Sequence, residues 1–201
     1  MAKAHGERFS GAAIIQRADR GRLAASGEWY VRKVLIIDTS ILCVWLDVPG
    51  MDHCGPDNDV WNRERLNQKI KSENQAQTTF VLPLATIIET GNHISQAPHS
   101  RRERGQALAE LMRLSAQERT PWAAFSEQST LWSSEKLIRL ADTWPPLADQ
   151  KVSLGDATIK DVAEYYAQMS FEVEILTGDQ GLKAYEPTSP SLKPRRRARN
   201  G

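Results

Sequence analysis

The chain has 201 residues, of which 40% are hydrophobic and 25% charged, and its net charge is only +1. This length and composition suit one soluble globular domain, and the apolar runs are well short of the ~20 residues that cross a bilayer. We therefore expect no membrane span and no secretion. The two cysteines, Cys43 and Cys54, lack zinc-ligand spacing, and a cytoplasmic location fits them best.

Positive charge is concentrated at the two ends of the chain. Residues 1–33 contain seven Lys or Arg against three acids, and residues 193–201 contain five basic residues and no acid. We interpret residues 1–32 as a basic, loosely ordered arm, residues 187–201 as a basic disordered tail and residues 33–186 as the folded domain. The tail is either a solubilising segment or a clamp on RNA phosphates. Its candidate contacts are Lys193, Arg195, Arg196, Arg197 and Arg199.

The first part of the folded domain alternates strand and helix patterns. Residues 34–37 form a continuous apolar run, as in a strand that helices cover on both faces. Asp38 then offers an N-cap to a helix that continues to Leu46. Proline and glycine predict a long loop over residues 47–59, and a polar helix follows over residues 60–73.

The next strand, over residues 78–82, precedes a helix that begins near Pro83. The apolar spacing of that helix predicts that Ile88 is buried. Residues 101–118 predict an amphipathic helix that buries Met112. Its arginines are either a solvated face or contacts to an RNA backbone, and the candidates are Arg101, Arg102 and Arg104.

The last part of the domain predicts two helices and a strand. Residues 131–141 form a helix that ends before two prolines, and residues 155–169 have the clearest helical spacing. Residues 171–176 alternate as a strand whose Glu172 and Glu174 face is the more exposed. Strands that alternate with helices are typical of an α/β domain, in which helices cover a central parallel sheet.

Four acidic residues lie at or near the boundaries of these elements. Asp38 ends the first strand and Glu89 follows an apolar stretch, whereas Asp156 opens a helix and Asp179 follows the last strand. Ligands of open parallel sheets bind beyond the carboxyl ends of the strands, so we expect Asp38, Asp156 and Asp179 to converge within reach of one metal ion. Clustered carboxylates repel one another without a cation, which predicts Mg²⁺ or Mn²⁺ and phosphate chemistry. The structural alternatives are a solvated side chain for Glu89 and a helix cap for Asp156.

In this order, the segments around the four acids resemble a PIN domain over residues 33–186. They are Leu-Ile-Ile-Asp-Thr-Ser-Ile-Leu at 35–42, Glu89, Gly-Asp-Ala-Thr-Ile at 155–159 and Leu-Thr-Gly-Asp-Gln-Gly-Leu at 176–182. The resemblance implies a three-layer α/β/α fold and an endoribonuclease that depends on Mg²⁺ or Mn²⁺, including the toxins of toxin–antitoxin pairs. It implies that the catalytic and metal-binding residues are Asp38, Glu89, Asp156 and Asp179. The hydroxyls that would hold these acids or bound water belong to Thr39, Ser40 and Thr177.

The resemblance also implies partners, and it leaves alternatives open. RNA is the implied substrate, and an antitoxin-like protein inhibitor and a second copy of the chain are candidate partners. Two departures from the family concern residues 123–146, which lack the apolar strand often found there, and the long loop over residues 47–59. The main alternative is a catalytically inactive PIN-like module that binds RNA or protein. A response-regulator receiver lacks its paired early acids, and an aspartyl-nucleophile phosphohydrolase lacks Asp-x-Asp at Asp38.

Overall fold

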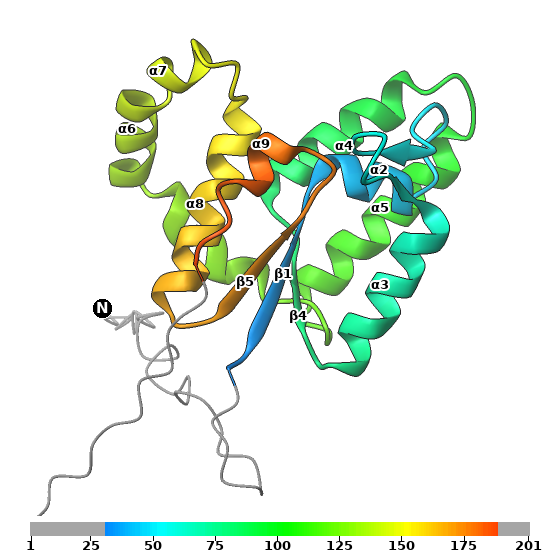
Figure 1. The fold of residues 1–201 in the computed structure, drawn as a ribbon, viewed down its shortest axis with the longest axis horizontal. Coiled ribbons are helices and arrows are strands. Elements are labelled where there is room, and N and C mark those ends of the chain that lie inside the picture. The colour runs from blue at the N-terminus through cyan, green and yellow to red at the C-terminus, as the bar shows by residue number, and fades with distance from the viewer. Residues whose placement is uncertain (1–30, 189–201) are drawn as a thin grey trace, which may run out of the picture. The chain divides into compact units, whose positions relative to one another are not determined.

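A parallel sheet forms the centre of the computed structural model, which describes residues 31–188 (Figure 1). The strands are β1 (Lys33–Ile37), β4 (Thr79–Val81) and β5 (Glu172–Leu176), in the order β4-β1-β5. Leu35 of β1 pairs with Phe80 on one side and Glu174 on the other. This arrangement confirms the predicted α/β class with a parallel sheet.

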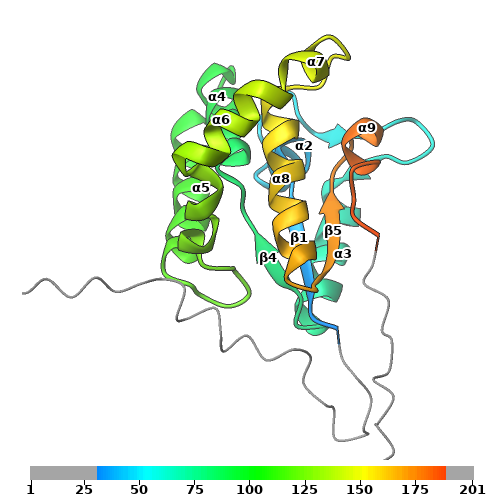
Figure 2. The ribbon, with the colours of Figure 1, turned by 90° about the vertical axis from the view of Figure 1, so that its left-hand side faces the viewer.

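Helices cover both faces of the sheet because β1 is apolar on both sides. Leu35 and Ile37 point into one core, and Val34 and Ile36 point into the other. The first core is closed by α2 (Thr39–Trp45), α3 (Arg63–Gln75), α4 (Leu84–Gln96) and α5 (Arg101–Ala116). The second core is closed mainly by α8 (Leu154–Gln168), which runs along the sheet in Figure 2. Within residues 31–188, no helix is both long enough and apolar enough to cross a bilayer.

A single residue pairs with the outer edge of β4, where a further strand would begin. Trp122 forms a parallel bridge with Phe80, whose backbone N–H donates to Pro121 O at 2.8 Å and whose carbonyl accepts from Ala123 N at 2.8 Å. The chain then forms the 3₁₀ helix η1 (Phe125–Trp132), α6 (Ser134–Thr143) and α7 (Pro145–Ala148). The helix predicted over residues 131–141 is therefore divided at Ser133, which caps α6.

The predicted loop over residues 47–59 contains part of a hairpin. Strand β2 (His53–Cys54) pairs antiparallel with β3 (Trp61–Asn62), with His53 opposite Asn62 and Cys54 opposite Trp61. Two-residue strands are too short for an alternating pattern, which is why the sequence predicted only a loop. We refer to residues 47–62 as the hairpin segment.

Two apolar residues that were predicted to be buried lie on the surface. Ile88 is 54% exposed and Met112 is 42% exposed. In α4, the side turned inward carries Thr86 and Thr90 together with Ile94. Thr86 Oγ1 donates to the carbonyl of Ile37 at 2.9 Å, so a hydroxyl rather than a large apolar group meets the end of β1.

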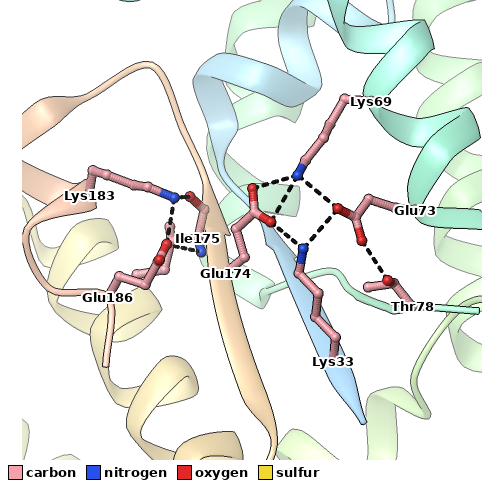
Figure 3. A network of polar contacts seen from close by, with 8 residues as sticks. All are labelled: Lys33, Lys69, Glu73, Thr78, Glu174, Ile175, Lys183 and Glu186. Carbon is pink, nitrogen blue, oxygen red and sulfur yellow. Dashed lines mark hydrogen bonds and ion pairs between the residues drawn. The ribbon is translucent and has the colours of Figure 1, made fainter. Parts of the chain in front are cut away.

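The face of β5 that was predicted to be more exposed is covered by a network of charges. Glu174 Oε2 lies 2.6 Å from Lys33 Nζ, and its Oε1 lies 2.9 Å from Lys69 Nζ. Both lysines also contact Glu73 Oε1, at 2.8 and 2.7 Å, and Thr78 donates to the other oxygen of Glu73 (Figure 3). The network joins β1, β5 and α3 at the face covered by α3. The alternation of residues 171–176 did not reveal it because the lysines come from distant segments.

The outer edge of β5 is closed by side chains of the segment that follows it. Glu186 Oε2 accepts a hydrogen bond from the backbone N–H of Ile175 at 2.9 Å, and Lys183 Nζ donates to the carbonyl of Ile175 at 3.0 Å (Figure 3). Lys183 belongs to α9 (Gln180–Lys183) and also pairs with Glu186. Edge strands with free backbone groups invite pairing with other chains, and these two side chains occupy the groups of Ile175.

Candidate active site

Asp38 lies buried at the carboxyl end of the central strand, with only 5% of its surface exposed. It is the N-cap of α2, in an extended backbone conformation. Its Oδ2 atom accepts a hydrogen bond from Ser40 Oγ at 2.7 Å and another from Thr177 Oγ1 at 2.8 Å. The hydrogen bonds to the Asp38 carboxylate within the described residues all go to Oδ2. Two hydroxyls from separate segments therefore orient this carboxylate.

The turn after β5 is tied to the same group. Gly178 N donates to Ser40 Oγ at 3.1 Å, and Asp179 N donates to Thr177 Oγ1 at 2.9 Å. Asp179 is exposed, and its Oδ1 accepts the backbone N–H groups of Gly181 and Leu182 at 2.6 and 3.2 Å. Asp179 thus caps α9, and the residue before it, Gly178, contacts Ser40.

Glu89 approaches the site from α4. Thr39 Oγ1 donates to its Oε2 at 2.9 Å, so the residue after Asp38 positions the second acid. On its other side, Glu89 lies against the first turn of α8. A Cβ atom placed on Gly155 would overlap Glu89 Oε1 and lie 2.9 Å from its Cδ. The glycine allows Glu89 to reach the backbone immediately before Asp156.

Asp156 forms a capping box with Ser153 at the start of α8. Asp156 N donates to Ser153 Oγ at 2.9 Å, and Ser153 N donates to Asp156 Oδ2 at 3.3 Å. Burial raises the pKa of the Asp156 carboxyl, and the hydrogen bonds from Ser153 lower it. The charges of Asp38 and Asp179 raise this pKa further, so Asp156 lies close enough to both to be affected by their charge. Asp156 is therefore part of a helix cap and also a neighbour of the other acids.

No Lys or Arg within residues 31–188 forms an ion pair with these acids. We define the acidic quartet as Asp38, Glu89, Asp156 and Asp179. The lysines and arginines that form ion pairs in the described part of the chain form them with other acids. A group of carboxylates without a counter-charge favours a bound cation or a proton.

The chemistry of this donor set fits a hard divalent ion, because carboxylate and hydroxyl oxygens are the ligands of Mg²⁺. The side chains as they stand are not gathered into one coordination shell. In the described part of the chain, no group of three or more His, Cys, Asp or Glu is arranged to hold a metal ion. The reason is local, since Asp156 and Asp179 each direct an oxygen to a helix cap. Convergence of Asp38, Asp156 and Asp179 on one ion stays a prediction. It requires Asp156 and Asp179 to give up their helix-cap hydrogen bonds.

The basic residues proposed to contact RNA differ in their surroundings. Arg104 is partly buried and pairs with Asp47 at 2.8 Å, and its role as an RNA contact stays a prediction. Arg101 Nε donates to the carbonyl of Ala97, and Arg102 is exposed on α5. The five basic residues of the tail, from Lys193 to Arg199, lie outside the described residues.

Three features of the site were missed from the sequence. Gly155 and Gly178 each precede an acid and permit close contacts, and Cys54 of the hairpin segment lies against Gly178. The signal was present, because a glycine directly before an acid at an element boundary indicates close backbone approach. No protein-family model, curated protein or solved structure matches this chain significantly, so the function has to be inferred from the geometry.

Proposed function

We propose that this chain is a PIN-like endoribonuclease that depends on Mg²⁺ or Mn²⁺ and hydrolyses phosphodiester bonds. One observation carries the proposal. Acids from four separate segments gather around the carboxyl end of the central strand without a single basic partner among the described residues. Burying and clustering carboxylates is costly unless a cation compensates them.

Each acid of the quartet would contribute differently to holding an ion. Asp38 is the oriented ligand, because the hydroxyls of Ser40 and Thr177 restrict its rotation. Glu89 is positioned by Thr39, and Asp156 and Asp179 supply charge from the two neighbouring turns. A bound Mg²⁺ or Mn²⁺ would supply activation of a water molecule and stabilisation of charge on the phosphate. No Lys or Arg of the described residues forms an ion pair with these four acids, so a bound cation would be the main partner for phosphate there.

The test compares cleavage of single-stranded RNA in Mg²⁺ or Mn²⁺ with cleavage in EDTA. We expect activity only with the ion, and we expect Asp38→Asn to lose at least about a hundredfold, since even partners of metal ligands contribute ~10–100-fold. Asp142→Asn is the matched control. Asp142 is exposed on α6 and is not a member of the quartet, and its variant should cut normally.

A thermal melt provides a second measurement that does not depend on activity. The ion should raise the Tm of the wild type by mass action, and this rise should shrink in Asp38→Asn. In EDTA, the variant should melt no lower than the wild type, because losing one charge relieves repulsion and the amide oxygen remains an acceptor. Full cleavage in EDTA would contradict the proposal. RNA binding without cleavage in any ion would instead favour the catalytically inactive binding module.

A further inference from the structure

A cleft opens to solvent beside Asp38, between the hairpin segment and the turn that follows β5. It is shallow and wide open, with a volume of about 460 Å³. Its walls are formed by Ser40, Cys54, Gly55, Pro56, Gly178, Asp179 and Gln180. Ser40 and Asp179 belong to both the cleft and the candidate active site, so a ligand in the cleft would lie against Asp179 and against the hydroxyl that orients Asp38.

Two glycines bring the walls into backbone contact at one end. A Cβ atom on Gly178 would lie 2.7 Å from Gly55 N and 2.8 Å from Cys54 Sγ. Gly55 has a φ of +95°, a conformation that favours glycine. The surroundings of Cys54 in the wall also shift the pKa of its thiol. Burial raises the pKa of its thiol, the Ser40 hydroxyl lowers it, and the Asp38 charge raises it further.

The hairpin wall is held in place from both of its ends. At the start of the hairpin segment, Asp47 is bound by Arg63 at 3.0 Å and by Arg104 at 2.8 Å. At its end, the Arg65 guanidinium lies 3.9 Å from the centre of the Trp61 ring and pairs with Asp59 at 2.7 Å. These contacts come from α3 and α5, so ion pairs and a cation–π contact connect the wall to the rest of the domain.

The lining is neutral apart from Asp179, and this determines what it can accept. A carboxylate repels phosphate, and no Lys or Arg lines the cleft to attract it. Backbone groups, a thiol and an amide instead suit the neutral parts of a nucleotide, which carry hydrogen-bonding edges. Bases become available to such a cleft only when they are unstacked, as in single-stranded RNA.

We propose that the cleft binds the base and ribose of the nucleotide next to the scissile phosphate in single-stranded RNA, and that the hairpin segment determines which nucleotide is accepted. The inference rests on the proposed function, because it places the phosphate at the acidic quartet. It adds to that function a binding site built from residues 54–56 and 178–180. These residues supply selectivity, whereas the quartet supplies the chemistry.

Cys54 offers a probe of occupancy that needs no catalysis. The chain has two cysteines, and Cys43 is fully buried with its pKa raised to about 11, chiefly by burial. A maleimide at alkaline pH should therefore label Cys54. To prevent cleavage, the experiment uses Asp38→Asn with Mg²⁺ present, because the ion offsets the repulsion between the quartet and the phosphate. A saturating short single-stranded RNA of random sequence should then slow labelling at least fivefold, whereas a duplex of the same composition should protect much less. Labelling that is unchanged while RNA is bound, as measured by fluorescence anisotropy, would overturn the inference.

Filling the cleft tests selectivity. Gln180→Trp places a large side chain in the wall, and we expect about tenfold weaker RNA binding, comparable to the loss of one base contact. We also expect altered nucleotide frequencies beside the cut in a randomised RNA. Gln106→Trp is the control, because Gln106 is exposed on α5 and does not line the cleft. Equal affinity and equal cut-site frequencies in both variants would reject the cleft.

The outcomes separate the two proposals. Metal-dependent cleavage without protection of Cys54 would leave the nuclease intact and reject the cleft. Protection of Cys54 by single-stranded RNA without cleavage in any ion would support the cleft and reject the nuclease.

Discussion

The orientation of Asp38 depends on hydroxyl groups, one of which lies far from it in the sequence. Thr177 donates to Asp38 Oδ2 at 2.8 Å and accepts the N–H of Asp179 at 2.9 Å, and it is itself buried. One hydroxyl thus satisfies an acid of the first strand and the backbone of the last turn.

Replacing this hydroxyl should affect stability and activity together. We expect Thr177→Val to lower the free energy of unfolding by ~1–3 kcal/mol, because a buried carboxylate and an N–H lose their partner. Metal-dependent RNA cleavage should fall as well. Thr177→Ser keeps the hydroxyl and should lose only ~0.8 kcal/mol for the missing methyl group. Denaturant melts and cleavage rates measure both effects, and identical behaviour of the two variants would contradict this role.

Gly155 separates the folding role of α8 from the positioning of Glu89. In Gly155→Ala, the new Cβ would displace the Glu89 carboxylate, so cleavage should fall clearly. Stability should stay equal or rise by up to ~1 kcal/mol, because Ala suits a helix better than Gly and the displaced atoms end a flexible side chain.

Gly105→Ala is the matched control for this substitution. Gly105 also lies in a helix, α5, and a Cβ there would meet no atom within 4 Å. The control should gain similar stability while cutting RNA at the wild-type rate. If Gly155→Ala cut equally well, Glu89 would have no part in the site.

Among the elements, α3 is joined to the sheet by charges rather than by apolar packing alone. Burial by itself raises the pKa of Glu73, but hydrogen bonds from Lys33, Lys69 and Thr78 lower it to about 2. A carboxyl whose pKa is lower in the folded state stabilises the fold fully above the unfolded-state value of ~4.3. This stabilisation is lost as the pH falls from there towards 2.

Glu73→Gln should reveal this contribution. At neutral pH we expect a loss of about 2 kcal/mol, less than the ~3–5 kcal/mol of a fully buried pair, because the two lysines remain partly exposed. The variant should also lose less stability than the wild type between pH 5 and pH 2. In the wild type, this loss falls between the unfolded-state pKa of Glu73, ~4.3, and its folded-state pKa of about 2. Denaturant melts across this range measure the difference. Glu135→Gln, on the exposed start of α6, should stay within ~0.5 kcal/mol of the wild type, and a parallel pH dependence of Glu73→Gln and wild type would contradict the assignment.

At the scale of the whole molecule, charge is distributed unevenly between the acidic site and the basic ends of the chain. The tail from Lys193 to Arg199 lies outside the described residues, and its five basic residues are known from the sequence alone. Phosphate contacts contribute affinity without selecting a sequence, so a role in RNA binding would complement a cleft that no Lys or Arg lines.

Truncation after Pro190 tests this role. If the tail grips phosphates, RNA binding should weaken, and the slope of log K against log salt should become shallower by ~0.7 for each phosphate that the tail no longer neutralises. Cleavage at saturating RNA should stay near normal, since the quartet is intact. A full-length chain with its five tail Lys and Arg changed to Gln should behave like the truncation. Unchanged affinity and salt slope would leave the tail without an RNA role.

The sequence by itself determined the features that depend on neighbouring residues. The apolar run over residues 34–37 predicted a strand buried on both faces, and the spacing over residues 155–169 predicted the helix that became α8. Asp38, Asp156 and Asp179 were found because each stands at an element boundary, which local pattern reveals. Glu89 lies inside α4 instead, so the boundary prediction was wrong for it. Asp156 was recognised as both a helix cap and a site candidate, and the structure places the capping box there.

Only the tertiary structure decided the features that depend on distant segments. The order β4-β1-β5, the ion pairs of Glu174 with two lysines and the exposure of Ile88 follow from packing between elements. The same is true of the hairpin segment, whose two-residue strands acquire a fixed position through contacts with α3 and α5. Local pattern cannot anticipate such contacts, because their free energy arises only when residues far apart in the chain meet.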